Sequence, residues 1–138
     1  MKVQTYLFFD GRCEEALHFY RDKLGAQIGD LMRYKEMPPE ENAPPIAAGN
    51  EEKIMYSSFQ MGDTTLMASD GIMGTHKPFE SFSLTIEVAE IAEAERLFAI
   101  LAEEGEVQMP LMPSFFSPSF GIVADKFGVS WMVMAESK

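Results

Sequence analysis

Two stretches of the chain place an apolar residue at every third or fourth position, and each follows a run rich in β-branched and aromatic residues. The first run, residues 3–9, is typical of a β-strand and stops at the turn signal Asp10-Gly11. Apolar residues then recur on one face of a helix, at Cys13, Ala16, Leu17, Tyr20 and Leu24. Acidic residues in the first turn, basic ones in the last and Gly25 beyond it suit the helix dipole and a C-terminal cap. The pattern predicts a strand followed by a helix.

Three further strands are expected after this helix, over residues 27–34, 53–61 and 64–68. Gly62-Asp63 between the last two is typical of a tight hairpin. The segment from Pro38 to Pro45 is polar and rich in proline, which cannot continue a strand ladder. A loop is therefore expected there, and its use is not identified by the sequence.

The same order of elements recurs in the second half. Residues 79–88 are expected to form a strand, and a second apolar stripe ended by Gly105 predicts a helix, with Ile91, Ala94, Leu97, Phe98 and Leu101 on one face. Three more strands are expected over residues 107–112, 121–124 and 129–134, with a closing turn at 125–128. A β-α-β-β-β unit therefore occurs twice, as an internal repeat over 1–70 and 79–136. We expect one α+β domain over 1–138, because neither half is long enough to be comfortable alone.

Charge and cysteine content narrow the classes of function. The formal net charge is −11, which disfavours nucleic acid and anionic membrane surfaces as partners. Cys13 is the only cysteine, so no internal disulfide can form and a reducing compartment is favoured. The sequence has no run of signal-peptide or membrane-spanning type, and a cytoplasmic location is expected.

Three segments carry a family resemblance: residues 6–20, with Phe19-Tyr20 ahead of Leu24-Gly25-Ala26, and residues 125–131, which end in Gly128-Val129-Ser130-Trp131. A weaker match covers residues 62–70. With the element order, they resemble the vicinal-oxygen-chelate superfamily of glyoxalase I, bleomycin-resistance proteins, dihydroxybiphenyl dioxygenases and fosfomycin-resistance enzymes. Within it, the PhnB-like branch is the most similar. The resemblance implies two tandem modules that form a cupped half-barrel sheet, and a homodimer, as in many relatives.

Superfamily enzymes hold a divalent cation with His, Gln or Glu side chains on the first and last strands of each unit. The matching positions in this chain are Gln4 or Thr5, Leu66 or Met67, Ser83, and Met132. Only Gln4 is a credible ligand, so no metal site and no cofactor are predicted. The two histidines do not rebuild a site: His18 is expected on the solvent face of the first helix, and His76 in a surface loop that could reach over the cup.

The candidate ligand-binding residues are polar, aromatic or thioether side chains on strands expected to line the cup, together with one aromatic residue in a proline-broken segment. They are Gln4, Tyr6, Phe8, Tyr56, Met67, Trp131 and, in the broken segment, Phe115. For any one of them, a place in the core or in a dimer seam is the alternative. Cys13 lies where a helix N-terminus can lower a thiol pKa, but its place in the apolar stripe favours core packing.

Three hypotheses about function follow, and no catalytic residue is identified. The first is a metal-free protein that binds a small organic molecule in an aromatic-lined cup. The second is a superfamily enzyme of lyase, transferase or dioxygenase type, with a rebuilt or absent metal site. The third is a non-catalytic dimeric scaffold. Some relatives carry a methyltransferase name, but this sequence has no glycine-rich cofactor loop of the usual nucleotide-binding kind.

Overall fold

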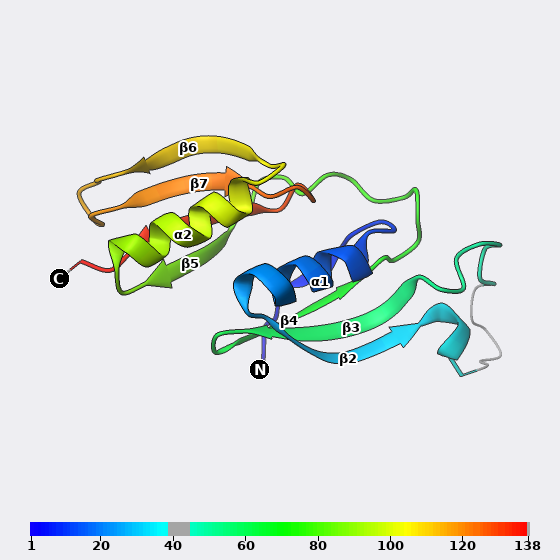
Figure 1. The fold of residues 1–138 in the computed structure, drawn as a ribbon. Coiled ribbons are helices and arrows are strands. Elements are labelled where there is room, and N and C mark those ends of the chain that lie inside the picture. The colour runs from blue at the N-terminus through cyan, green and yellow to red at the C-terminus, as the bar shows by residue number, and fades with distance from the viewer. Residues whose placement is uncertain (39–44, 138) are drawn as a thin grey trace. The chain divides into compact units, whose positions relative to one another are not determined.

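The chain folds into two compact units, residues 1–76 and 77–138. The computed structural model describes residues 1–38 and 45–137, so most of the expected proline-rich loop lies outside the described residues. Each unit is a β-α-β-β-β module with four strands in one open sheet and one long helix (Figure 1). The predicted α+β class and the two tandem modules are confirmed. Over the same described ranges, no helix is long and apolar enough to cross a membrane.

The first module contains β1 (Tyr6–Phe8), α1 (Cys13–Leu24), β2 (Gln27–Arg33), the short 3-10 helix η1 (Tyr34–Glu36), β3 (Ile54–Met61) and β4 (Thr64–Ser69). Its strand order is β1-β4-β3-β2, with β1 parallel to β4 and the other neighbours antiparallel. The strand predicted over residues 3–9 is shorter in the structure. Pairing with β4 begins at Tyr6, and Val3 is 88% exposed.

Helix α1 covers one face of the first sheet with the predicted apolar stripe. Cys13, Ala16, Leu17 and Tyr20 are buried, and the Tyr20 ring stacks on Phe59 of β3 with 5.9 Å between centroids. Gly25 ends the helix at φ 76°, and its N–H donates to the carbonyl of Tyr20. Since Phe59 faces the helix, the residues directly before and after it in β3 face the other side of the sheet.

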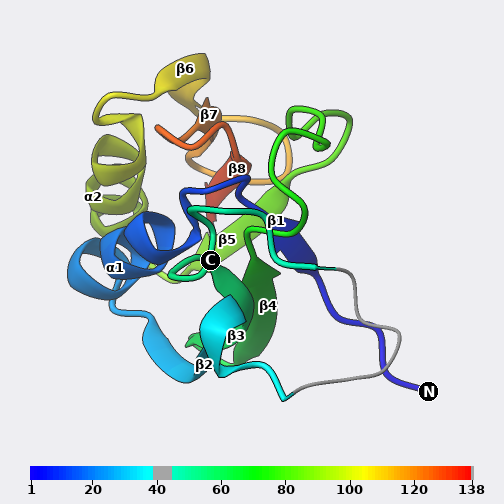
Figure 2. The same ribbon diagram turned by 90° about the vertical axis from the view of Figure 1, so that its right-hand side faces the viewer.

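The second module contains β5 (Leu84–Val88), α2 (Ile91–Ala102), β6 (Glu106–Met112), β7 (Phe120–Ala124) and β8 (Ser130–Ala135). Its strand order is β5-β8-β7-β6, with β5 parallel to β8, so both sheets have the same topology. Figure 2 shows α1 on one side of β3 and β4, and α2 on one side of β7 and β8. The strand predicted over 79–88 begins only at Leu84. Ser81, at φ 65°, is in the left-handed region, which interrupts extended backbone.

Gly105, at which the second apolar stripe ends, is not the cap residue of helix α2. Helix α2 is capped at Glu103, and Glu104 rather than the glycine adopts a positive φ, 56°. A Cβ on Gly105 would lie 2.3 Å from the carbonyl oxygen of Ala124. Glycine is therefore needed because the start of β6 approaches β7 closely, and not because the helix needs a left-handed cap.

Two buried aspartates fix the loops of the modules. Asp70, directly after β4, is 1% exposed. Its Oδ1 accepts the backbone N–H groups of Gly11 and Cys13, each at 2.8 Å, and its Oδ2 accepts that of Ile54 at 2.8 Å. A single carboxylate thus ties the loop after β1, the first turn of α1 and the start of β3 together. Buried charge is tolerated only where it is hydrogen-bonded in this way.

In the second module, the Asp125 carboxylate likewise fixes backbone by hydrogen bonds, here within a turn. Its Oδ1 accepts the N–H groups of Phe127 and Val129, and its Oδ2 accepts the indole N–H of Trp131 at 2.9 Å. Gly128, at φ 89°, donates its N–H to the carbonyl of Asp125 and closes the turn predicted at 125–128.

Replacing Asp70 by alanine is expected to lower the free energy of unfolding by about 3 to 5 kcal/mol, because three backbone N–H groups lose a charged acceptor. Chemical denaturation measures this change. Asp30→Ala is the matched control, since Asp30 is exposed on β2 and its carboxylate has no hydrogen-bond partner among the residues that the structure describes. A loss for Asp70→Ala no larger than that for Asp30→Ala would refute the anchoring role.

The Cys13 thiol is expected to resist alkylation in the native protein. Burial raises its pKa from 9.0 to about 12, and the Asp70 carboxylate adds to the shift. At pH 8, iodoacetamide should leave native Cys13 unmodified by mass spectrometry and modify it in denaturant, since the thiolate is the nucleophile. Because the unfolded thiol ionises first, this group's stabilisation is complete below pH 9.0 and is lost as pH rises toward about 12. Rapid labelling of folded protein would contradict the assignment of Cys13 to the core.

Candidate functional site

The face of the first sheet opposite α1 gathers four of the predicted ligand-binding residues. Tyr6 pairs with Met67 across β1 and β4, and Phe8 and Tyr56 follow the same alternation. The rings of Tyr6 and Phe8 lie 4.9 Å apart, and 43% of Phe8 is exposed. Gln4, the fifth residue of this set, precedes β1 and is half-buried. We call this surface the first open face.

His76 extends the aromatic row of the first open face. Its ring stacks on Phe8 with 4.8 Å between centroids and 12° between planes. Its Nε2 is buried and has no hydrogen-bond partner. A Cβ on Gly71 would lie 2.3 Å from that nitrogen, so only glycine, here at φ 64°, admits the imidazole. The sequence expectation of a surface-loop histidine is thus replaced by a half-buried ring packed on the sheet.

Trp131 lies on the helix-covered face of the second sheet and not on the open face, where it was expected. It is 3% exposed and shares a face of β8 with Val133, which pairs with Gly121. A Cβ on Gly121 would meet the Phe98 ring of α2 at 2.8 Å, so this face is the helix-covered one. The expectation that Trp131 lines a ligand cup is wrong, because its indole belongs to the core and donates to Asp125.

Phe115 belongs to an exposed tip rather than to a pocket wall. It is 100% exposed, follows the loop at Pro113 and contacts Phe116 edge-to-face with centroids 5.1 Å apart. Phe116 in turn contacts Phe120 at 4.9 Å. The three rings form a ridge that leads from β7 into solvent.

The second sheet carries a hollow of about 560 Å³ on the face away from α2, which we call the second-sheet hollow. Its floor contains Ser83 and Ser130, whose hydroxyl oxygens lie 2.6 Å apart, beside Met132. The other lining residues are Phe79, Glu80, Ser81, Phe82, Gln108 and Ile122. A concave surface with apolar walls and a few polar groups is the usual form of a small-molecule site.

Sequence reasoning did not identify this hollow. It weighed Ser83 and Met132 only as metal positions, and it placed Phe79 and Phe82 in a strand. One signal was present: polar Ser83, Thr85 and Glu87 alternate with apolar Leu84, Ile86 and Val88. That alternation shows which face of β5 is open.

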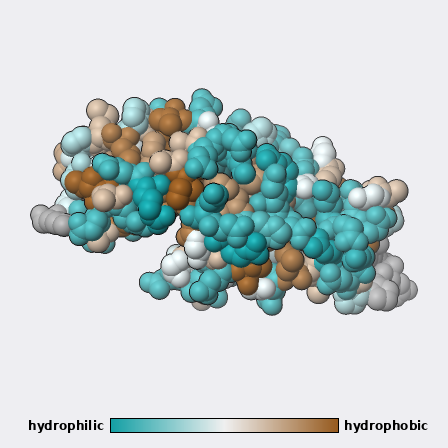
Figure 3. Space-filling view, viewed as in Figure 1, coloured by the Kyte–Doolittle hydropathy of each residue, from teal (hydrophilic) through white to brown (hydrophobic). Residues whose placement is uncertain are grey.

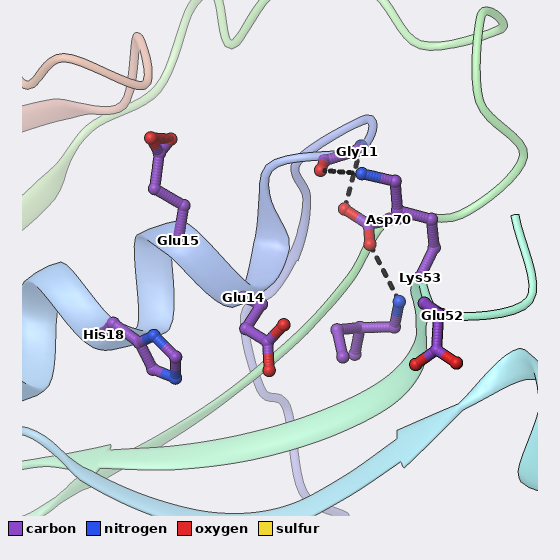
Figure 4. Close-up of a pocket in the computed structure, with 8 residues that line it drawn as sticks. Gly11, Glu14, Glu15, His18, Glu52, Lys53 and Asp70 are labelled. Atoms are coloured by element: carbon purple, nitrogen blue, oxygen red, sulfur yellow. Dashed lines mark hydrogen bonds between the residues drawn. The ribbon is translucent and has the colours of Figure 1, made fainter. Parts of the chain in front are cut away.

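A second hollow, of about 430 Å³, lies between α1 and the start of β3 in the first module (Figure 4). Most of its polar groups already have partners. Asp70 bonds to Gly11, and Lys53 Nζ donates to the carbonyl of Gly11 at 2.9 Å. Glu14 accepts from Arg33, which lowers the pKa of Glu14. His18, at the rim, is exposed as predicted. These side chains hold the loop after β1, and their chemistry is committed to structure.

Of the metal positions that the family resemblance implies, Gln4 alone carries a ligand of the usual kind. Met67 and Met132 offer thioethers, and Ser83 offers a hydroxyl that is bonded to Ser130. Elsewhere in the described ranges, no group of three or more His, Cys, Asp or Glu could hold a metal ion.

Comparison with known proteins identifies relatives along the whole chain. The family model described as 3-demethylubiquinone-9 3-methyltransferase matches residues 1–134. Protein YjdN of Escherichia coli (strain K12) is 30% identical over 138 residues, which cover 96% of this chain and 94% of that protein.

Solved structures agree with this match. A protein from Pseudomonas aeruginosa is 37% identical with a TM-score of 0.86, over 100% of this chain and 99% of that one. The PhnB protein from Bacillus cereus is 31% identical with a TM-score of 0.81, over 98% and 99%. The fosfomycin-resistance protein FosX of Listeria monocytogenes, only 9% identical over 99% and 93%, shares the fold with a TM-score of 0.63. The chain therefore belongs to the PhnB-like, or 3-demethylubiquinone-9 3-methyltransferase, family.

Proposed function

We propose that this protein binds a small organic molecule on the open faces of its sheets, without a catalytic metal ion. The observation that carries the proposal is the second-sheet hollow. Its volume of about 560 Å³ lies within the range of small-molecule sites, and it combines two phenylalanine rings with a hydroxyl pair. Aromatic walls supply contact area, and the few polar groups supply orientation.

The first open face supports the same proposal. Tyr6, Phe8 and His76 present a continuous row of rings, with Met67 beside Tyr6 on the neighbouring strand. Rings in a row suit a flat or aromatic ligand, which they contact by stacking. Gln4 and Tyr56 would add hydrogen-bonding groups at its margins.

The residue types at the superfamily metal positions support a degenerate metal site. Two thioethers and an internally bonded hydroxyl leave Gln4 as the single oxygen donor of the expected kind. We therefore derive no reaction step through a metal ion. The methyltransferase activity in the family's description needs a methyl donor, so S-adenosylmethionine belongs among the ligands to be tested.

A fragment screen observed by NMR on protein with labelled methionine methyl groups should yield compounds that shift Met132 or Met67. These two methyl groups lie in the hollow and on the first open face, whereas Met1 at the exposed terminus is an internal control. Met132→Ala should weaken compounds that shift Met132 by about tenfold, the effect of losing one buried thioether contact. A screen in which no compound shifts either methyl group would defeat the proposal.

Elemental mass spectrometry on the same protein distinguishes metal-free ligand binding from the metal-dependent enzyme hypothesis. We expect no stoichiometric Ni, Zn, Mn or Fe after incubation with each ion. Stoichiometric metal that Gln4→Ala abolishes would place the metal-dependent enzyme hypothesis first. Turnover of S-adenosylmethionine would do the same for methyl transfer.

We also propose that two copies of the chain associate through β6 and the tip that follows it. β6 is an edge strand of its sheet, and the apolar residues exposed there and on the tip are Val107, Met109, Met112, Phe115 and Phe116. Brown hydrophobic groups are visible among hydrophilic ones over β6 and β7 in Figure 3. Exposed apolar patches of this kind mark association surfaces. Pro110 has no N–H, so side chains rather than a continued ladder would make the contact.

Size-exclusion chromatography with light scattering should return a dimer for the natural chain and a monomer for the Met112→Ser, Phe115→Ser double variant. Val3→Ser, at an exposed apolar residue far from β6 in the sequence, is the control and should stay dimeric. Because each copy carries a net charge of −11, added salt should strengthen the dimer by screening repulsion. A monomeric natural chain at every salt concentration would exclude this interface.

A further inference from the structure

Resting on the proposed function, we infer that the second-sheet hollow recognises an organic cation, an alkylated ammonium group carried on a short chain with a hydroxyl or carbonyl. The inference joins an unpaired carboxylate, two phenylalanine rings and a polar floor, all within the lining of one hollow. Each of these features comes from the second module alone.

Glu80 supplies the negative charge. It is the only charged residue in the lining of the hollow, and it is exposed. Within residues 1–38 and 45–137, its carboxylate has no hydrogen-bond or ion-pair partner. Glu93 and Glu104 of the same module, by contrast, pair with Arg96 and Lys126. An unpaired carboxylate at the mouth of a hollow attracts a cationic ligand and repels an anionic one.

Phe79 and Phe82 flank that carboxylate in the sequence. Their rings meet edge-to-face with 6.2 Å between centroids, and 45% of Phe82 is exposed. Ser81 between them has a left-handed backbone, which brings the two rings together instead of placing them along a strand. Aromatic ring faces attract ammonium groups, and methylated ammonium is the form most often held this way because it is poorly hydrated.

The floor of the hollow selects the rest of the ligand. The hydroxyl groups of Ser83 and Ser130 bond to each other at 2.6 Å, which uses one of their two protons and leaves the other available. The Gln108 side-chain amide has no hydrogen-bond partner among the residues that the structure describes. Met132 and Ile122 fill the apolar remainder. A hydroxyl or carbonyl oxygen two or three bonds from the ammonium would find these donors.

The charge of the module points the same way. Residues 77–138 contain ten Asp and Glu against four Lys and Arg. None of the four strands of the second sheet contains Lys or Arg, whereas β5 contributes Glu87 and β6 contributes Glu106. The field over the sheet is therefore negative, which raises the local concentration of cations.

Three probes of nearly identical shape test the inference: choline, 3,3-dimethylbutan-1-ol and 3,3-dimethylbutanoate. They carry a positive charge, no charge and a negative charge. In NMR titrations that follow the Met132 methyl group, choline should bind at least about threefold more tightly than the alcohol, and the carboxylate most weakly. Glu80→Gln and Phe82→Leu should each weaken choline by about threefold to tenfold. Glu80→Gln should leave the alcohol unchanged.

Glu95→Gln is the matched control, since Glu95 is an exposed acid on α2, against the other face of the sheet. It should alter none of the three affinities. Equal binding of choline and the alcohol, or of choline to natural protein and Glu80→Gln, would overturn the cation inference and leave small-molecule binding standing. If none of the three probes binds but other fragments shift Met132, the cation inference also fails. The proposed function itself would fail only if no compound at all bound to the protein.

Discussion

The first module depends on one buried carboxylate. Asp70 lies where β4 ends, and its two oxygens are occupied by N–H groups from the loop after β1, from the first turn of α1 and from the start of β3. A charge at this depth is stable only with all of these donors in place, so the three segments cannot move independently. The strand held at this end, β1, carries Tyr6 on the face that its partner Met67 of β4 also lines.

The second module is also fixed by a buried aspartate, but through different partners. Asp125 lies in the turn between β7 and β8 rather than after the last strand, and it binds two N–H groups of its own turn and the indole of Trp131. The modules therefore share topology but not the interactions that fix it. This agrees with a repeat visible in the order of elements and not in residue identity. The open faces differ as well: one presents a row of rings, and the other a hollow with a hydroxyl floor.

Both helices and most strands were predictable from periodicity, since the apolar stripes at Cys13–Leu24 and Ile91–Leu101 have no other solution in a chain of this size. The positions facing a ligand were harder to predict on β8, because both faces of that strand carry apolar residues and alternation does not then show which face is open. Trp131 was assigned to the wrong face for that reason. The identity of its indole partner, six residues earlier in a turn, is a tertiary fact that no periodicity contains.

The second-sheet hollow was missed for a related reason. Residues 79–83 have the composition of a strand, and only the left-handed backbone of Ser81 diverts them into a wall of the hollow. A glycine at this position would have indicated a left-handed backbone in the sequence, whereas a serine does not. Local propensity was outweighed here by the path that the chain must take to enter β5 at Leu84.

The parallel pairing in each sheet has a consequence for how the protein is made. Leu7 is aligned with Ala68, and Leu84 with Trp131, so among the described strands the first of each module pairs only with its last. During synthesis from the N-terminus, β1 must wait until β4 has left the ribosome, and β5 until β8 has done so. Bringing the ends of such a long loop together costs chain entropy before any hydrogen bond between the two strands forms. Each module is thus completed in a single late step, and a nascent chain stopped short of β8 leaves β5 and β7 without the strand that lies between them.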